Sequence, residues 1–132
     1  MSYLPYMHAF FMALAVILIL VAVVTVRRKK TGWFKLHRGA ASLGVVSALV
    51  AFMAEFIFKT AMNYPHVSSP HAIGGAITLM MLIVTPALGA KIASNQKFRS
   101  VHRMFGRITS AFVVLTAIAG VARFIQLLSI KS

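Results

Sequence analysis

The sequence contains 132 residues, of which 60% are hydrophobic and only 11% are charged. A soluble globular domain is about 45–50% apolar and about 25% charged, so this chain has too few polar side chains to cover a water-facing surface. Fourteen Lys and Arg residues stand against one acidic residue, Glu55, and no cysteine is present. The lack of cysteine excludes disulfides, thiolate metal sites, c-type haem attachment and iron–sulfur clusters. The basic residues fall between apolar runs rather than along an amphipathic face, which argues against a nucleic-acid partner.

The first apolar segment covers residues 4–26, and no charge occurs from Met1 through Val26. This length exceeds the roughly 20 apolar residues that a helix needs to cross the bilayer core. A signal peptide has a basic start and a small-residue cleavage site after a short apolar core, whereas this chain begins MSYLPYMHAFF and its charges follow the segment. We therefore expect the segment to be retained as a membrane anchor.

Three further apolar stretches of helical length cover residues 36–60, 71–91 and 102–128. Short polar connections separate them, and Pro70 stands where a helix can begin, because its missing N–H would have no intrahelical partner there. We predict an all-α membrane protein in which residues 1–132 form a single transmembrane four-helix domain, an up-down-up-down antiparallel bundle in contact with membrane lipid.

The basic residues are divided unequally between the two ends of such a bundle. Three lie on the side of the termini: Lys59, Arg123 and Lys131. Eleven lie in or beside the first and third connections: Arg27, Arg28, Lys29, Lys30, Lys35, Arg38, Lys91, Lys97, Arg99, Arg103 and Arg107. The positive-inside rule then predicts cytoplasmic basic loops, with both termini outside.

An internal repeat of about 64 residues aligns MHAFFMALAVILILV with PHAIGGAITLMMLIV, and KLHRGAASLGVVSALVAF with SVHRMFGRITSAFVVLTA. The repeated unit is a helical hairpin, and every span opens with one histidine. His8 and His71 belong to the outer layer of the predicted bundle, and His37 and His102 belong to the inner layer. With 1.5 Å per helical residue, the two layers lie roughly 20–30 Å apart, too far for one four-histidine metal site.

Each histidine pair joins diagonal helices of an up-down-up-down bundle, across a space wide enough for a flat macrocycle with one axial imidazole on each side. A bare zinc ion would need four ligands at short distance, and each layer offers two. Two bis-histidine b-type haems fit this pattern better. Small residues one and two turns after the histidines, including Gly75 and Gly106, would give a haem room. They would equally suit ordinary contacts between membrane helices.

At this point the chain resembles the cytochrome b561 superfamily of transmembrane di-haem electron carriers. In HRMFGRITSAFVVLTAIAG, Gly106 and Gly120 follow His102 by four and eighteen residues, and Gly75 and Gly89 follow His71 at the same offsets. The likeness covers the whole chain. It implies a four-helix core, haem ligands at His8 with His71 and at His37 with His102, and electron passage from a donor on one side of the membrane to an acceptor on the other.

The chain departs from animal and plant members in lacking their two additional helices and in carrying Glu55 where a small residue is expected. The four-helix core is closer to bacterial members, which implies a bacterial inner membrane. The donor and acceptor stay open: a quinol, an ascorbate-like reductant and a redox protein all suit such a carrier. A homodimer is compatible with the sequence.

The remaining polar residues have two interpretations each. Glu55 and Lys59 are four residues apart, a spacing that suits an ion pair near the membrane surface, with Arg123 as a further member. The alternative is that Glu55 accepts a proton linked to redox change. Arg38, Arg103 and Arg123 are suited to binding haem propionates. The positions of Arg38 and Arg103 are explained equally well by membrane topology and by anionic lipid headgroups. His66 reads as a solvated loop residue or as a contact to a haem edge or a substrate.

The leading hypothesis is transmembrane electron transfer by a di-haem b-type cytochrome, and whether the chain also acts as a reductase stays open. A second hypothesis is a haem-bearing membrane anchor or quinone-handling subunit of a larger oxidoreductase complex. A third is a small transporter or metal-handling bundle.

Overall fold

The computed structural model describes residues 3–28 and 30–129, except for the side chains of 127 and 128. Lys29 and Lys131, counted among the basic residues above, lie outside the described residues. Four α-helices make up the fold: α1 (Leu4–Arg28), α2 (Trp33–Ala61), α3 (Pro70–Lys91) and α4 (Phe98–Ser129). Helices α2 and α4 begin about one turn before the spans expected from hydropathy, so His37 and His102 lie about one turn inside their helices rather than at the start.

All four helices are long and apolar enough to cross a membrane. Large apolar side chains are exposed along every helix, among them Ile17, Leu43, Met80 and Leu115. Lipid is the solvent that such a surface requires, because water would leave this apolar area unfavourably hydrated. The prediction of an all-α protein with four membrane-spanning helices is confirmed, and the chain is an integral membrane protein.

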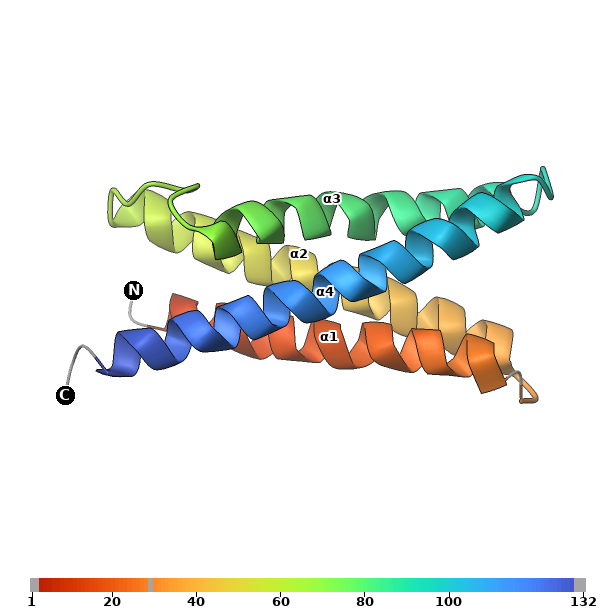
Figure 1. Cartoon of the computed structure of the whole chain (residues 1–132), viewed down its shortest axis with the longest axis horizontal. Coiled ribbons are helices and arrows are strands. Elements are labelled where there is room, and N and C mark those ends of the chain that lie inside the picture. The colour runs from red at the N-terminus through yellow and green to blue at the C-terminus, as the bar shows by residue number, and fades with distance from the viewer. Residues whose placement is uncertain (1–2, 29, 130–132) are drawn as a thin grey trace.

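The chain runs the length of the molecule in each helix and turns back at each loop (Figure 1). The start of α1, the end of α4 and the α2–α3 loop lie at one end, which we call the terminal end, and the α1–α2 and α3–α4 loops lie at the other, the basic end. The first loop turns at Gly32, whose φ of 76° is in the left-handed region. The α2–α3 loop ends at Ser69, whose hydroxyl caps the N–H of Ala72, and Pro70 opens α3 as predicted.

Small residues let α1 and α2 pack closely. A Cβ added to Gly44 would lie 2.9 Å from Cδ1 of Ile19, so the Ile19 side chain packs directly on the backbone of Gly44. The buried positions of this hairpin are otherwise mostly alanines: Ala15, Ala22, Ala40, Ala48, Ala51 and Ala54. Close backbone approach at small residues is the usual means of association in lipid, where no hydrophobic force draws helices together.

Threonine pairs take the place of these alanines between α3 and α4. The hydroxyls of Thr78 and Thr116 lie 2.8 Å apart and are buried, and those of Thr85 and Thr109 also lie 2.8 Å apart. The two threonine pairs are seven residues apart on each helix, from Thr78 to Thr85 on α3 and from Thr109 to Thr116 on α4. A single antiparallel register of the two helices therefore forms both pairs. The second hairpin therefore has hydroxyl–hydroxyl bonds between its helices at positions where the first hairpin packs small apolar residues.

The two hairpins make much less contact with each other than each makes within itself. Helix α1 touches α4 and α2 touches α3 over short stretches. Among the described residues, the diagonal helices α1 with α3 and α2 with α4 have no close backbone contact. Side chains must span the space between the diagonal helices.

Replacing Thr78 by Val removes one hydroxyl of a buried interhelical pair and leaves Thr116 without its partner. We expect the free energy of unfolding in micelles to fall by about 0.6 kcal/mol, and by no more than about 2 kcal/mol, the range found for such bonds between membrane helices. Thr25→Val is the matched control, because the Thr25 hydroxyl bonds only to the Ala22 carbonyl of its own helix. Equal losses in the two variants would show that the pair adds nothing between the helices.

Candidate functional site

Four histidines approach one another in two pairs, each across the diagonal of the bundle. The ring centres of His8 and His71 are 6.3 Å apart with an interplanar angle of 88°. Those of His37 and His102 are also 6.3 Å apart, with an angle of 82°. No group of three or more potential metal-ligating side chains is found among the described residues, so the histidines come as pairs only.

Every one of these imidazoles is tied to a backbone carbonyl of the helix beside it in its own hairpin. The Nδ1 of His8 lies 3.0 Å from the carbonyl oxygen of Ala51, and that of His37 lies 2.9 Å from Ala22 O. In the second hairpin, His71 Nδ1 lies 3.2 Å from Thr116 O and His102 Nδ1 lies 2.9 Å from Thr85 O. The same bond recurs four times, twice at each end of the bundle.

These bonds fix the protonation of the neutral rings. A carbonyl oxygen can only accept, so Nδ1–H is the donor in each bond and Nε2 carries the free lone pair. Among the described contacts, none of the four Nε2 atoms has a hydrogen-bond partner. Histidines that bind a metal ion nearly always donate their other ring N–H to a carbonyl or carboxylate, which sets the tautomer and the ring orientation. All four neutral rings therefore keep an unshared lone pair on Nε2, which is the form in which an imidazole can bind a metal ion.

Two glycines give the imidazoles of the second hairpin their places. A Cβ added to Gly120 would lie 2.8 Å from Cε1 of His71, and one added to Gly89 would lie 3.0 Å from Cε1 of His102. Each glycine is four residues after the threonine whose carbonyl accepts the bond, one helical turn further along the same face. The absent side chain leaves the ring room against the helix that carries that carbonyl.

The first hairpin lacks these glycines. The residue four positions after Ala51 is Glu55, and the residue four positions after Ala22 is Val26. Glu55 is therefore the counterpart of Gly120 in the first hairpin. It follows the residue whose carbonyl accepts from His8 by one turn, as Gly120 follows the residue whose carbonyl accepts from His71. Glu55, which departs from the small residue expected at this position, therefore makes the surroundings of His8 different from those of His71.

The other residues expected at the site lie close to it. A Cβ added to Gly75 would have only the Thr116 methyl within 4.0 Å, and one added to Gly106 only the Thr85 methyl, at 3.9 Å. Both glycines therefore lie beside open space rather than in tight helix contacts. Arg38 and Arg103 directly follow His37 and His102 and are exposed at the basic end.

A small polar cluster occupies the terminal end. Lys59 Nζ lies 3.7 Å from Glu55 Oε1, which confirms that ion pair, and it also donates to the carbonyl of His66 at 3.2 Å. The His66 ring stacks on Phe56 with centroids 4.5 Å apart, and the hydroxyl of Thr60 lies 3.4 Å from its Nε2.

The structure gives Arg123 a different neighbour from the one considered above. Its guanidinium donates to Gln126 Oε1 at 2.8 Å, one turn along α4. Within the described residues its side chain thus bonds to an amide, and Arg123 is not a member of the Glu55–Lys59 ion pair.

Sequence reasoning missed the carbonyl partners and the role of Gly89 and Gly120. A signal for both is present, because Thr-x-x-x-Gly occurs once in each helix of the second hairpin, as Thr85 to Gly89 and Thr116 to Gly120. No such signal marks the carbonyls of Ala22 and Ala51, because every residue has a main-chain carbonyl.

Comparison with known proteins gives one match. The model of the family described as eukaryotic cytochrome b561 matches residues 6–122, nearly the whole chain. No curated protein and no solved structure matches the chain closely enough for comparison. The matched range includes all four paired histidines, whereas the bacterial subtype expected from the four-helix length stays a prediction.

Gly120→Ala tests whether the missing side chain positions His71. The new methyl would overlap Cε1 of the ring, so we expect the Nδ1–H bond to Thr116 to break and the imidazole ¹⁵N and ¹H resonances of His71 to shift. Gly39→Ala is the matched control, because a Cβ there meets nothing within 4 Å. Spectra of the two variants that differ equally little from the parent would show that the glycine has no positioning role.

Proposed function

We propose, from the fact that the chain belongs to the cytochrome b561 family, that it carries two haem b groups, one between each histidine pair. Members of this family transfer electrons across membranes by means of haem b. Haem number and ligation in this chain are our inference. The observation that supports them best is the fourfold recurrence of the Nδ1–H bond to a carbonyl, with Nε2 left free on every ring.

The spacing of the rings fits an axial pair. A bond between a metal ion and an imidazole nitrogen is about 2.0 Å long, so two imidazoles on opposite sides of one ion have ring centres about 6 Å apart. Both pairs have a separation of 6.3 Å. Two imidazole rings that packed only against each other would be free to take other centre-to-centre distances. Nothing would then require the two pairs to have the same distance.

The surroundings also leave room for a macrocycle. The diagonal helices have no close backbone contact among the described residues, and the faces next to the rings carry Gly75 and Gly106 with open space beside them. Most of the buried side chains of the four helices are apolar. Such a dry environment of low dielectric is one of the means by which proteins set the potential of a haem.

The residues of this chain then have distinct tasks. Haem b supplies a one-electron couple when bound. The four histidines would hold its iron through Nε2, and the carbonyls of Ala22, Ala51, Thr85 and Thr116 would keep the rings in the tautomer that this requires. These carbonyl bonds also increase the basicity of Nε2, which favours ferric iron.

Basic residues near the ends of the bundle are suited to the propionates. Arg38 and Arg103 occupy equivalent places in the two repeats, one residue after the inner histidines, and Arg123 lies at the terminal end. A guanidinium binds a carboxylate through two parallel N–H bonds, and here no acidic side chain competes at the basic end. We infer that the basic end faces the cytoplasm, so that electrons cross between an external and a cytoplasmic partner.

Replacing single ligands tests the haem number. His8→Ala and His102→Ala should each reduce the haem content from two per chain to one, because each removes an axial ligand from a different pair. Pyridine haemochrome absorbance per chain measures this directly. His66→Ala is the control, since its ring stacks on Phe56 outside both pairs, and it should retain two haems. Loss of all haem in one ligand variant with a folded chain would contradict two separate sites.

Replacing Arg38 and Arg103 together by Gln tests the assignment of the propionate partners. Removing positive charge near a haem stabilises the ferric form, so the midpoint potential of the inner haem should fall. A loss of about 0.5–1 kcal/mol of electrostatic interaction corresponds to a fall on the order of 20–40 mV. Redox titration followed by absorbance measures it, with Arg28→Gln and Arg99→Gln together as the control of equal charge change. An equal fall in the control would assign the effect to the general field of the basic end.

A further inference from the structure

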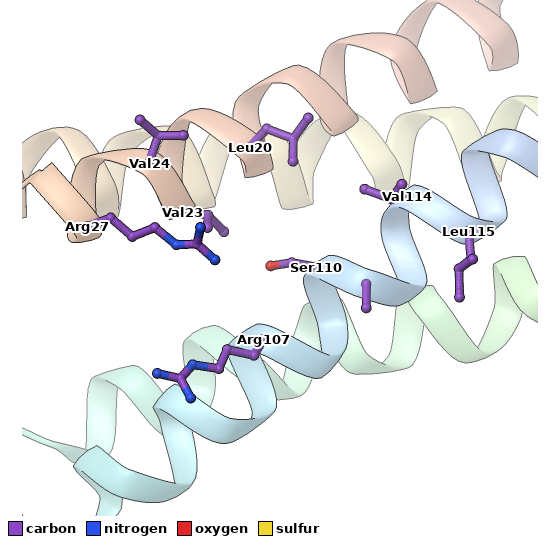
Figure 2. A pocket seen from close by; sticks show the side chains of 9 residues that line it. Leu20, Val23, Val24, Arg27, Arg107, Ser110, Val114 and Leu115 are labelled. Carbon is purple, nitrogen blue, oxygen red and sulfur yellow. The ribbon is translucent and has the colours of Figure 1, made fainter.

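An open groove runs between α1 and α4 on the side of the bundle (Figure 2). Its volume is about 550 Å³. Apolar side chains form most of its wall, with Ser110 as a small polar member. The lining comes from Leu20, Val23, Val24 and Arg27 of α1 and from Arg107, Ser110, Ala111, Val114 and Leu115 of α4.

Two arginines mark one end of this groove. Figure 2 shows Arg27 extending from α1 into the gap between the helices, and Arg107 on the facing helix α4. Arg27 is in the last turn of α1, so both lie toward the basic end. The Ser110 hydroxyl is already bonded to the Gly106 carbonyl at 2.6 Å, which leaves the guanidiniums as the main free donors.

The chain itself cannot neutralise these two arginines. Its one acidic side chain, Glu55, lies near the other end of α2 and is paired with Lys59. Two exposed guanidiniums beside an apolar groove can therefore be paired only by an anion from outside the chain. A molecule that matches both features of the groove is amphipathic, with an anionic group at one end and an apolar body.

The length of the groove agrees with an acyl chain. On α4 the lining extends from Arg107 to Leu115, a rise of about 12 Å. Half of a bilayer core is about 15 Å thick, so the apolar wall covers most of the depth of one leaflet. The arginines then lie toward the headgroups of that leaflet, where basic pockets between helices bind phospholipid phosphates.

The groove is separate from the proposed haem sites. None of its nine lining residues is a paired histidine or supplies a carbonyl to one. It opens to the side of the bundle, where lipid surrounds the protein. We propose that the groove between α1 and α4 binds an anionic phospholipid, with its phosphate held by Arg27 and Arg107 and an acyl chain along the apolar wall.

Arg27→Gln with Arg107→Gln tests the charged half of this site. The purified haem-loaded protein is depleted of lipid, exposed to equal amounts of phosphatidylglycerol and phosphatidylcholine in mixed micelles, and analysed by native mass spectrometry. We expect the parent to prefer phosphatidylglycerol by about thirtyfold, with about fivefold from each arginine, and the double variant to lose that preference. Arg28→Gln with Arg99→Gln is the control of equal charge change outside the groove, and it should keep the preference.

Ala111→Phe tests the apolar half without changing any charge. The ring would fill the groove, so phosphatidylglycerol binding should fall about as far as in the arginine variant. Ala119→Phe adds the same bulk at an exposed position of α4 outside the groove and should leave binding unchanged.

Three outcomes would overturn the proposal. The first is an unchanged lipid preference in the arginine double variant. The second is equal loss in the two charge variants, which would indicate general attraction to the basic end. The third is loss of one haem, or a shift of one haem spectrum, in the arginine variant with lipid binding intact, which would reassign the two guanidiniums to a haem propionate.

Discussion

The hydrogen bond from an imidazole Nδ1–H to a main-chain carbonyl is the interaction on which this site depends. In lipid a polar ring nitrogen without a partner is costly, so each histidine near a membrane-spanning helix must satisfy at least one of its two nitrogens. Here all four imidazoles donate Nδ1–H to a carbonyl of their own hairpin, which leaves Nε2 available to a partner between the hairpins. Tautomer, ring orientation and the separation of each pair follow from this one arrangement.

The two hairpins reach the same ring geometry with different packing. Alanines and Gly44 bring α1 and α2 together, whereas buried threonine pairs and the glycines at 89 and 120 serve α3 and α4. Both solutions keep the contact strong within a hairpin and weak between hairpins. That division is what a cofactor between hairpins needs, because each half can hold its ligands rigidly while the space between the halves stays open.

Much of this could be predicted from sequence because lipid imposes long apolar helices, and because a repeat of His-Ala and His-Arg marks both hairpins. The four spans, the family and the pairing of histidines across the repeat came from those signals. The ion pair of Glu55 with Lys59 followed from a four-residue spacing, whereas the equivalence of Glu55 and Gly120 depends on which carbonyls accept from His8 and His71. Main-chain carbonyls carry no residue identity, so Ala22 and Ala51 could not be found in this way. The groove with Arg27 and Arg107 depends on the tilt of α4 against α1, which no single helix encodes.

The central claim is that each histidine pair holds one haem iron. Anomalous diffraction from crystals of the haem-loaded protein at the iron absorption edge tests it most directly. The account predicts two iron peaks per chain, one between the rings of His8 and His71 and one between those of His37 and His102. A single peak, or peaks away from these ring pairs, would contradict it.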